Sequence, residues 1–219
     1  MSTILDLHIH SVFSVDSPVQ PEEYLEHLLA LRKSFHIDGL AFCEHRRFVA
    51  EFDYHSLAQR YGVVVLAGVE AETRWGHLLV FCPDQKWMSH IGFEQKFDPI
   101  ELAKEVEAHQ GIVIPAHPFR GMFAMGMGER VSELPHLYAI ETINGGNRPE
   151  ENQNAIELAE RLGVAQVGGS DAHFLDELGL AMTEFEKDVR SVHAMIQEIK
   201  AGRVRALSRN KTSFYAPQI

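Results

Sequence analysis

The chain has 219 residues, of which 45% are hydrophobic and 23% are charged, and its formal net charge is −11. This composition is that of an ordinary globular protein, and the length suits one compact domain. The negative charge disfavours a polyanion-binding surface, because nucleic-acid affinity depends on neutralising phosphates with Lys and Arg. We therefore expect no stable complex with nucleic acid.

No segment predicts insertion into a membrane or secretion. The longest apolar stretch, residues 63–69, is far shorter than a membrane-spanning helix. Asp6, His8 and His10 lie where a signal peptide would need an apolar run. Two cysteines cannot define a disulfide framework. A cytoplasmic protein without a membrane partner is the resulting expectation, and the oligomeric state is left open.

Short β-like runs alternate with helical patterns along the chain. Strands are predicted at residues 4–10, 39–45, 63–70, 77–81, 112–116, 138–143, 165–169 and 204–207. Helices are predicted at residues 21–32, 55–61, 149–162 and 189–201, and another begins at Asp98-Pro99 and ends at Gly111. Strands separated by helices imply parallel βαβ units. The repeated unit predicts an α/β fold with a single domain over residues 1–219, and a closed or distorted barrel rather than an open sheet.

Polar motifs lie at the ends of most predicted strands. The residues concerned are His8, His10, Glu44, His45, Glu70, His77, His117, Asp171 and His173. In parallel barrels the C-terminal strand ends converge on one face, where residues from distant parts of the chain meet. An isolated histidine is usually a solvated or core residue, whereas this concentration at strand ends predicts a shared site.

The residue types at these ends indicate a metal site. Imidazole and carboxylate ligands suit zinc, manganese or iron, and the lack of thiolate ligands argues against a closed structural zinc site. More ligands are present than one tetrahedral ion requires. Clustered cations generate hydroxide near neutral pH and offset charge in an in-line displacement, as phosphoester hydrolysis requires. No glycine-rich phosphate loop or nucleophile elbow is present, which disfavours a covalent Ser or Cys mechanism.

Six short runs share their order and spacing with one known family. They are Asp6-Leu7-His8-Ile9-His10-Ser11 with Asp16, Glu44-His45, Gly68-Val69-Glu70, His77-Leu78-Leu79, Ala116-His117-Pro118 and Gly169-Ser170-Asp171-Ala172-His173. These runs resemble the polymerase and histidinol phosphatase (PHP) superfamily over nearly the whole chain. The resemblance implies a distorted (β/α)7 barrel and a stand-alone PHP-domain phosphoesterase with three divalent ions. One departure is Glu44, where the family commonly has Asp, and its longer side chain is expected to orient His45 as an acceptor.

The resemblance also implies three groups of metal ligands. His8, His10, Glu70 and Asp171 would hold the first ion, and Glu70 would bridge to the second. The second ion would also take His77 and His117, and the third would take Asp16, His45 and His173. A bridging water or hydroxide would be the nucleophile. Glu70 and Asp171 are accordingly the carboxylates expected to take part in catalysis.

Two arginines near these motifs are candidate phosphate contacts, because Arg is the natural planar, bidentate partner of a phosphate. Arg120 lies three residues after His117 and is the first candidate for a catalytic contact. Arg148 follows Asn144 and Asn147 in the loop after the sixth predicted strand. A surface salt bridge is the alternative for Arg148, since that is the usual fate of a loop arginine.

Four functions fit these observations. The leading hypothesis is hydrolysis of a small phosphorylated substrate, either a phosphomonoester or a phosphodiester. An exonuclease acting on short oligonucleotides uses the same chemistry. Clustered metals in a barrel also serve amide and C–N hydrolysis, as in amidohydrolases. A metal-binding or regulatory module without catalysis is the fourth hypothesis, and the complete set of ligands argues against it.

Overall fold

The computed structural model describes residues 2–121 and 126–209. The strands in this part of the chain are β1 (Thr3–Ile9), β2 (Gly39–His45), β3 (Val64–Glu72), β4 (His77–Phe81), β5 (Ile112–Pro115), β6 (Ala139–Asn144), β7 (Ala165–Gly169), β8 (Ala181–Phe185) and β9 (Val204–Ser208). The helices are α1 (Pro21–Leu31), α2 (Tyr54–Tyr61), α3 (Gln85–Met88), α4 (Pro99–Ala108), α5 (Pro149–Leu162) and α6 (Val192–Lys200). None of the helices in these residues is long and apolar enough to cross a membrane.

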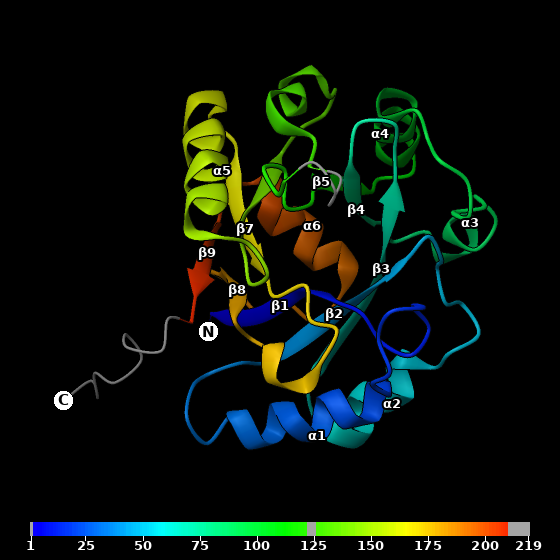
Figure 1. Cartoon of the computed structure of the whole chain (residues 1–219). Helices are drawn as coiled ribbons and strands as arrows, with labels where there is room; N and C mark the ends of the chain where they lie inside the picture. The colour runs from blue at the N-terminus through cyan, green and yellow to red at the C-terminus, as the bar shows by residue number, and fades with distance from the viewer. Residues whose placement is uncertain (1, 122–125, 210–219) are drawn as a thin grey trace.

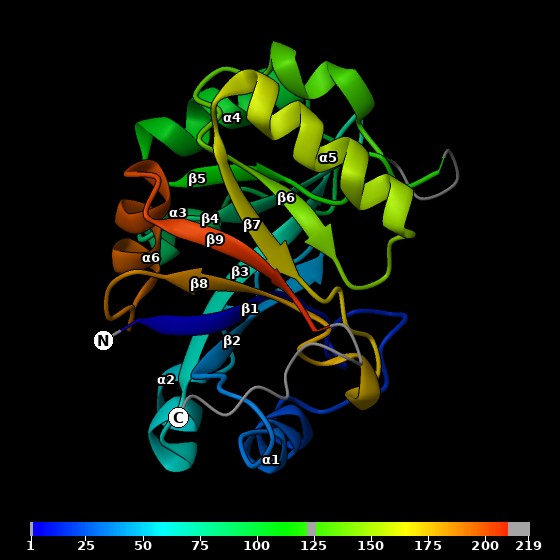
Figure 2. The same cartoon turned by 90° about the vertical axis from the view of Figure 1, so that its left-hand side faces the viewer.

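The strands form a large sheet of mixed direction and a small parallel sheet (Figure 1; Figure 2). The larger sheet has the order β5-β4-β3-β2-β1-β8-β9, and β6 pairs with β7 in a separate two-stranded sheet. β1, β2 and β3 are parallel, whereas β4 and β8 run antiparallel to their neighbours. The expected α/β class is therefore confirmed. The distorted (β/α)7 barrel is not confirmed, because no named strands of the two sheets pair in the described residues; β1 meets the chain after β7 in an isolated bridge between Ile9 and Ala172.

The connection between β3 and β4 explains part of this difference. Only Thr73–Gly76 separate the two strands, and Thr73 closes the turn by donating its N–H and Oγ to the carbonyl of Gly76. A parallel crossover needs a dozen or more residues, so this turn forces an antiparallel hairpin. Because β4 is reversed, its first residue, His77, lies at the same end of the sheet where β3 finishes, opposite Glu72.

Three apolar clusters hold the layers together. The interior cluster includes Leu5, Leu79 and Phe185 from the large sheet and is covered at one end by Met195 and Ile199 of α6. A second cluster packs α4 and α5 against β4, β5 and β6. A third packs α1 and α2 against β1 and β2, at the bottom of both views (Figure 1; Figure 2). Burial of this apolar surface stabilises the sheet ends that carry the polar motifs.

Candidate metal centre

The structure brings all nine predicted ligands together at one end of the sheets. They come from β1, β2, β3 and β4 and from the loops that follow β1, β5 and β7. Three groups of side chains in the described residues could each hold a metal ion: His8, His10, Glu70 and Asp171; Glu70, His77 and His117; and His10, His45 and His173. The first two groups are the predicted ones, and the third contains His10 where Asp16 was expected.

The first group has the spacing of a tetrahedral site. His8 Nε2 lies 3.0 Å from His10 Nε2 and 3.2 Å from Asp171 Oδ1, and His10 Nε2 is 3.0 Å from the same oxygen. Glu70 Oε2 lies 3.5 Å and 3.4 Å from the two ring nitrogens. Four ligand atoms bound to zinc at about 2.0–2.1 Å stand roughly 3.3 Å apart, so these four atoms suit one cation.

The second group converges on the other oxygen of Glu70. His77 Nδ1 lies 2.8 Å and His117 Nε2 lies 2.9 Å from Glu70 Oε1. Glu70 Oε2 lies 2.8 Å from His45 Nδ1. Neither this oxygen nor His117 Nδ1 makes a hydrogen bond of suitable geometry among the described residues, and both atoms are buried. A buried polar atom without a partner costs free energy unless another group satisfies it. The donor set and the Glu70 oxygen therefore fit divalent cations.

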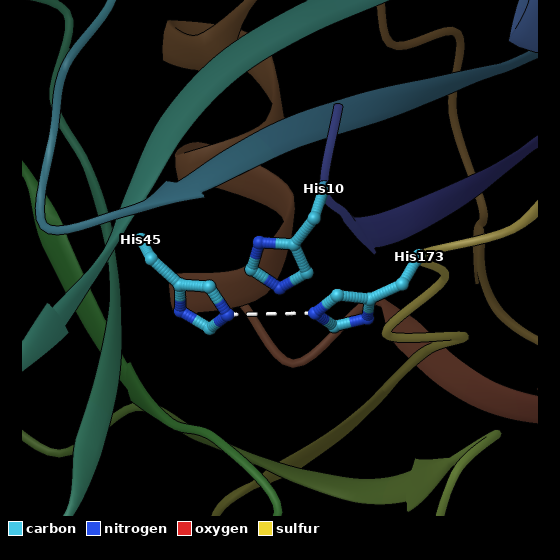
Figure 3. Close-up of side chains that lie close together, drawn as sticks. All are labelled: His10, His45 and His173. Atoms are coloured by element: carbon cyan, nitrogen blue, oxygen red, sulfur yellow. Dashed lines mark hydrogen bonds between the residues drawn. The ribbon is translucent and has the colours of Figure 1, made fainter. Parts of the chain in front are cut away.

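Asp16 lies beside the two predicted histidines of the third group, although it is not one of the group's members. His45 Nε2 lies 3.2 Å from Asp16 Oδ2 and 3.4 Å from His173 Nε2, and His173 Nε2 is 3.4 Å from the same Asp16 oxygen. The rings of His10, His45 and His173 lie side by side (Figure 3). The His10 ring stacks on the other two while its Nε2 faces the first group. Asp16 therefore lies within reach of the two predicted histidines, as His10 does.

Two of the converging residues have unusual backbone conformations. His117 has φ +33° and Asp171 has φ +57°, in a region that side chains other than glycine rarely adopt. Such conformations cost about 1–3 kcal/mol each and persist where surrounding contacts hold them. The N–H of Asp171 donates to the carbonyl of His8 at 2.7 Å, and the N–H of His117 donates to Glu141 at 2.8 Å.

The buried charges of the first group stabilise one another. Burial alone would raise the pKa of Glu70, but the charge of His8 and hydrogen bonds from three histidines hold that pKa well below its usual range. Burial opposes ionisation of Asp171 in the same way, and His8 and His10 outweigh it and lower the pKa. Burial would lower the pKa of His8, but three carboxylates raise it well above its usual value. Burial lowers the pKa of His10 to about 4.

The two candidate arginines have different surroundings. Arg120 Nη1 donates to Asp171 Oδ2 at 2.6 Å, and its other nitrogens donate to the side chains of Asn144 and Asn147. Arg120 therefore lies beside the metal centre. Arg148 is mostly exposed and pairs with Glu151 at 2.8 Å, which is the surface salt bridge given as its alternative.

Glu44 does not orient His45 directly, contrary to expectation. Its carboxylate accepts hydrogen bonds from the N–H and hydroxyl of Ser11 and from the Ser14 hydroxyl at 2.5 Å. Ser14 Oγ in turn accepts the backbone N–H of His45 at 3.0 Å and lies 3.4 Å from His10 Nδ1. Glu44 is therefore linked to His45 and His10 through Ser14.

Two buried carboxylates were not assigned a role from sequence. Glu141 lies in the middle of β6 and accepts a hydrogen bond from His8 Nδ1 at 2.9 Å. A charged residue in the middle of a predicted strand was the signal that could have identified it. Asp6 accepts the N–H groups of Ser170 and Gly179 and so ties β1 to the loop that carries Asp171. Burial raises the pKa of Asp6 to about 6, although these hydrogen bonds oppose the shift.

Comparisons with known proteins agree with the fold and the motifs. Residues 149–204 match the family model described as PHP-associated. This match, together with the motifs at the strand ends, supports a PHP-superfamily protein. An uncharacterized protein of Methanocaldococcus jannaschii is 25% identical to it over 189 residues, covering 84% of this chain and 70% of that protein.

Solved structures share the PHP-type fold at low sequence identity. PsfC from Pseudomonas syringae is 21% identical, with a TM-score of 0.71 over 96% of this chain and 93% of that chain. A protein of Bifidobacterium adolescentis, provisionally assigned as a metal-dependent phosphoesterase, is 15% identical, with a TM-score of 0.61 over 90% of this chain and 96% of that chain. At these identities the likeness establishes the fold alone.

Two further structures differ from these in their stated activities. An amidohydrolase from Chromobacterium violaceum is 17% identical, with a TM-score of 0.64 over 93% of this chain and 97% of that chain. A lesion-specific endonuclease from Pyrococcus furiosus is 16% identical, with a TM-score of 0.65 over 94% of this chain and 58% of that chain. The endonuclease weakens our expectation that nucleic acid is not a partner, because a nucleic-acid enzyme has the same fold.

Proposed function

We propose that this PHP-superfamily protein is a metal-dependent phosphoesterase that hydrolyses a small phosphomonoester or phosphodiester. The observation that carries the proposal is the position of Glu70. Its Oε1 lies 2.8 Å and 2.9 Å from His77 and His117, while its Oε2 faces His8 and His10 at 3.4–3.5 Å. A carboxylate placed between two such groups can bridge two cations, as in two-metal hydrolases.

The proposed ligands comprise three sets, for as many as three ions of zinc, manganese or iron. His8, His10, Glu70 and Asp171 form the first set, Glu70, His77 and His117 the second, and Asp16, His45 and His173 the third. When bound, such ions supply a water of lowered pKa and positive charge for the oxygens of a phosphoester. The protein's own contribution is to hold the donor atoms at fixed separations, most of them on buried side chains.

Arg120 is the proposed substrate-binding side chain. Three of its hydrogen bonds are to Asp171, Asn144 and Asn147, whereas a guanidinium carries five N–H groups. The side chain is 21% exposed, so its remaining donors have access to a ligand at the metal centre. The bond to Asp171 holds the guanidinium in place and leaves Asp171 Oδ1 facing the first set. Arg120 can therefore orient one phosphate oxygen beside the ligands.

Glu70→Gln tests the proposal at the bridging position. An amide cannot offer two anionic oxygens to two cations, so turnover is expected to fall by about 10²-fold or more while the fold is retained. Turnover of a phosphomonoester, the circular dichroism spectrum and the metal content are measured for Glu70→Gln and for the control variant Glu72→Gln. Glu72 lies on the same strand but is paired with Arg46 and Lys96. Near-normal activity of Glu70→Gln at full metal occupancy would rule out the bridging role.

A substrate panel separates the alternatives. The purified protein, supplied with manganese or zinc, is assayed against phosphomonoesters, dinucleotides, longer oligonucleotides and amides. Hydrolysis of the small esters, with efficiency flat or falling as the nucleotide chain lengthens, supports the proposal. Efficiency that climbs with length and binding that weakens steeply in salt would favour a nuclease, because a polymer-binding groove contacts successive phosphates. Amide hydrolysis alone would indicate an amidohydrolase-type reaction.

A further inference from the structure

Glu141 is a buried carboxylate, and both of its oxygens accept hydrogen bonds from residues at the candidate metal centre. The residue is 0% exposed, in the middle of β6. Oε1 accepts a hydrogen bond from His8 Nδ1 at 2.9 Å. Oε2 accepts the backbone N–H of His117 at 2.8 Å and an amide N–H of Asn144 at 2.9 Å. Glu141 belongs to none of the three candidate ligand groups in the described residues.

The hydrogen bond to His8 determines which ring nitrogen can bind a cation. An ionised carboxylate only accepts hydrogen bonds, so Nδ1 of His8 must carry the proton. In the neutral ring the lone pair is then on Nε2, and it is this nitrogen that lies 3.0–3.2 Å from His10 Nε2 and Asp171 Oδ1. A carboxylate that holds the second nitrogen of a metal-binding histidine fixes both its tautomer and its orientation.

The hydrogen bond to His117 supports a strained backbone in the second ligand set. His117 has φ +33°, and its N–H points at Glu141 Oε2. Without that oxygen the buried N–H would lose its partner, at a cost of about 1–3 kcal/mol. Glu141 therefore holds the ring of His8, a proposed ligand of the first set, and the backbone of His117, a proposed ligand of the second set.

The residues around Glu141 leave room for this arrangement. A Cβ added to Gly169 would lie 2.7 Å from Glu141 Oε1 and 2.4 Å from the Cβ of His8. Glycine at this position therefore leaves the space in which His8 and Glu141 meet. Asn144, held by Glu141 through its amide nitrogen, presents its oxygen to Arg120.

We propose that Glu141 is a positioning residue that sets the tautomer of His8 and the backbone of His117, and so couples the first and second ligand sets. The inference rests on the proposed function in one respect, that these sets bind divalent cations. It goes beyond that function because it assigns the connection between the two sets to Glu141, a residue that binds no ion itself.

The first test uses the wild-type protein loaded with zinc. Long-range ¹H–¹⁵N correlation spectra distinguish a histidine protonated at Nδ1 from one protonated at Nε2. His8 is expected to carry its proton on Nδ1, with the signal assigned by its loss in His8→Gln. A zinc-loaded wild-type protein in which His8 carries its proton on Nε2 would overturn the proposal. This measurement does not depend on whether any Glu141 variant folds.

The second test measures zinc affinity of Glu141→Gln by competition with a chelating indicator. The glutamine amide offers one oxygen and one NH₂ group, so it cannot accept from both His8 and His117. Zinc affinity is expected to fall by about 10–100-fold. Glu141→Asp keeps both acceptor oxygens on a shorter side chain and is expected to lose less. The matched control is Glu198→Gln, since Glu198 is a buried carboxylate of α6 that pairs with Arg203 at 2.6 Å.

Wild-type zinc affinity in Glu141→Gln would overturn the proposal, as would an equal loss in the Glu198→Gln control. Neither readout requires turnover. A protein that binds zinc in this Glu141-dependent way but hydrolyses no phosphate ester would refute the proposed function and leave the role of Glu141 supported. A protein that hydrolyses phosphate esters with unchanged zinc affinity in Glu141→Gln would do the reverse.

Discussion

Arg120 lies where the proposed ligand Asp171 meets the loop after β6. Its guanidinium is fixed on three sides by Asp171, Asn144 and Asn147. A fixed guanidinium loses little side-chain entropy when it binds an anion, and its planar fork suits a phosphate. Arg148 lacks this support, because its side chain is 68% exposed and pairs with Glu151.

These surroundings predict different effects of two matched substitutions. Arg120→Ala is expected to lower kcat/KM for a phosphate ester by about 10–100-fold, because a hydrogen bond to a charged group contributes about 1.5–3 kcal/mol. Arg148→Ala is expected to stay within about twofold of wild type, since exposed pairs contribute little. Steady-state kinetics at equal metal occupancy make the comparison. Equal losses in the two variants would contradict the assignment of Arg120.

His8 predicts how metal binding depends on pH. In the metal-free protein, burial would lower its pKa, but Asp171, Glu141 and Glu70 raise it well above the usual value. His8 therefore carries an extra proton at neutral pH, and a cation must displace that proton to bind. His10, whose pKa is lowered to about 4 by burial, is already neutral.

Zinc affinity is accordingly expected to fall as pH falls, by about tenfold per pH unit for one displaced proton, and to level off above the pKa of His8. Competition titrations between about pH 6 and pH 8 measure the slope. Calorimetry in two buffers of different ionisation enthalpy counts the protons released. A zinc affinity that does not change over this range would show that His8 is not protonated in the metal-free protein.

The sequence alone indicated which polar residues gather at the site, because strand ends of parallel units converge whatever the details of the sheet. His77 is an exception: it begins its strand and lies at the site because that strand is reversed, which the parallel prediction did not include. Glu141 was not identified, because its role depends on which ring nitrogen and which backbone N–H it faces. The path from Glu44 through Ser14 was missed for the same reason.

At the scale of elements, the helices were predictable from their ends. Asp98 accepts the N–H groups of Ile100 and Glu101 at the start of α4, and Gly163 ends α5 in a left-handed conformation. β8 was missed because its five residues lack a long periodic pattern. Strand direction was wrong for β4, although the four-residue turn before it already excluded a parallel crossover.

The end of β7 must approach β1 closely for the site to form. Gly169→Ala would place a Cβ 2.4 Å from the Cβ of His8, so β7 and β1 would have to separate. We expect a loss of about 1–3 kcal/mol in the free energy of unfolding of the metal-free protein. Urea unfolding followed by circular dichroism measures it. Gly121→Ala is the control, because its added Cβ meets nothing nearer than 4.0 Å.

At the scale of the whole molecule, the two sheets are not paired strand to strand in the part of the chain that the structure describes (Figure 2). The ligand sets extend across this division. Asp171 follows β7 of the small sheet, whereas His8, His10 and Glu70 belong to β1 and β3 of the large sheet or follow them. Local contacts connect the two sheets. For example, Thr183 Oγ1 of β8 makes hydrogen bonds with the backbone of Gly168 in β7.

An ion bound by the first set would therefore act as a cross-link between the sheets. His10 and Asp171 are 161 residues apart, and a disulfide that closed a loop of this length would remove about 5 kcal/mol of chain entropy from the unfolded state. Removing the ions with a chelator is expected to lower the melting temperature and to speed amide hydrogen exchange first in β6 and β7. A uniform change across both sheets would contradict this. The same cation that serves the reaction would then protect the chain from proteolysis, with the small sheet as the part exposed when metal is scarce.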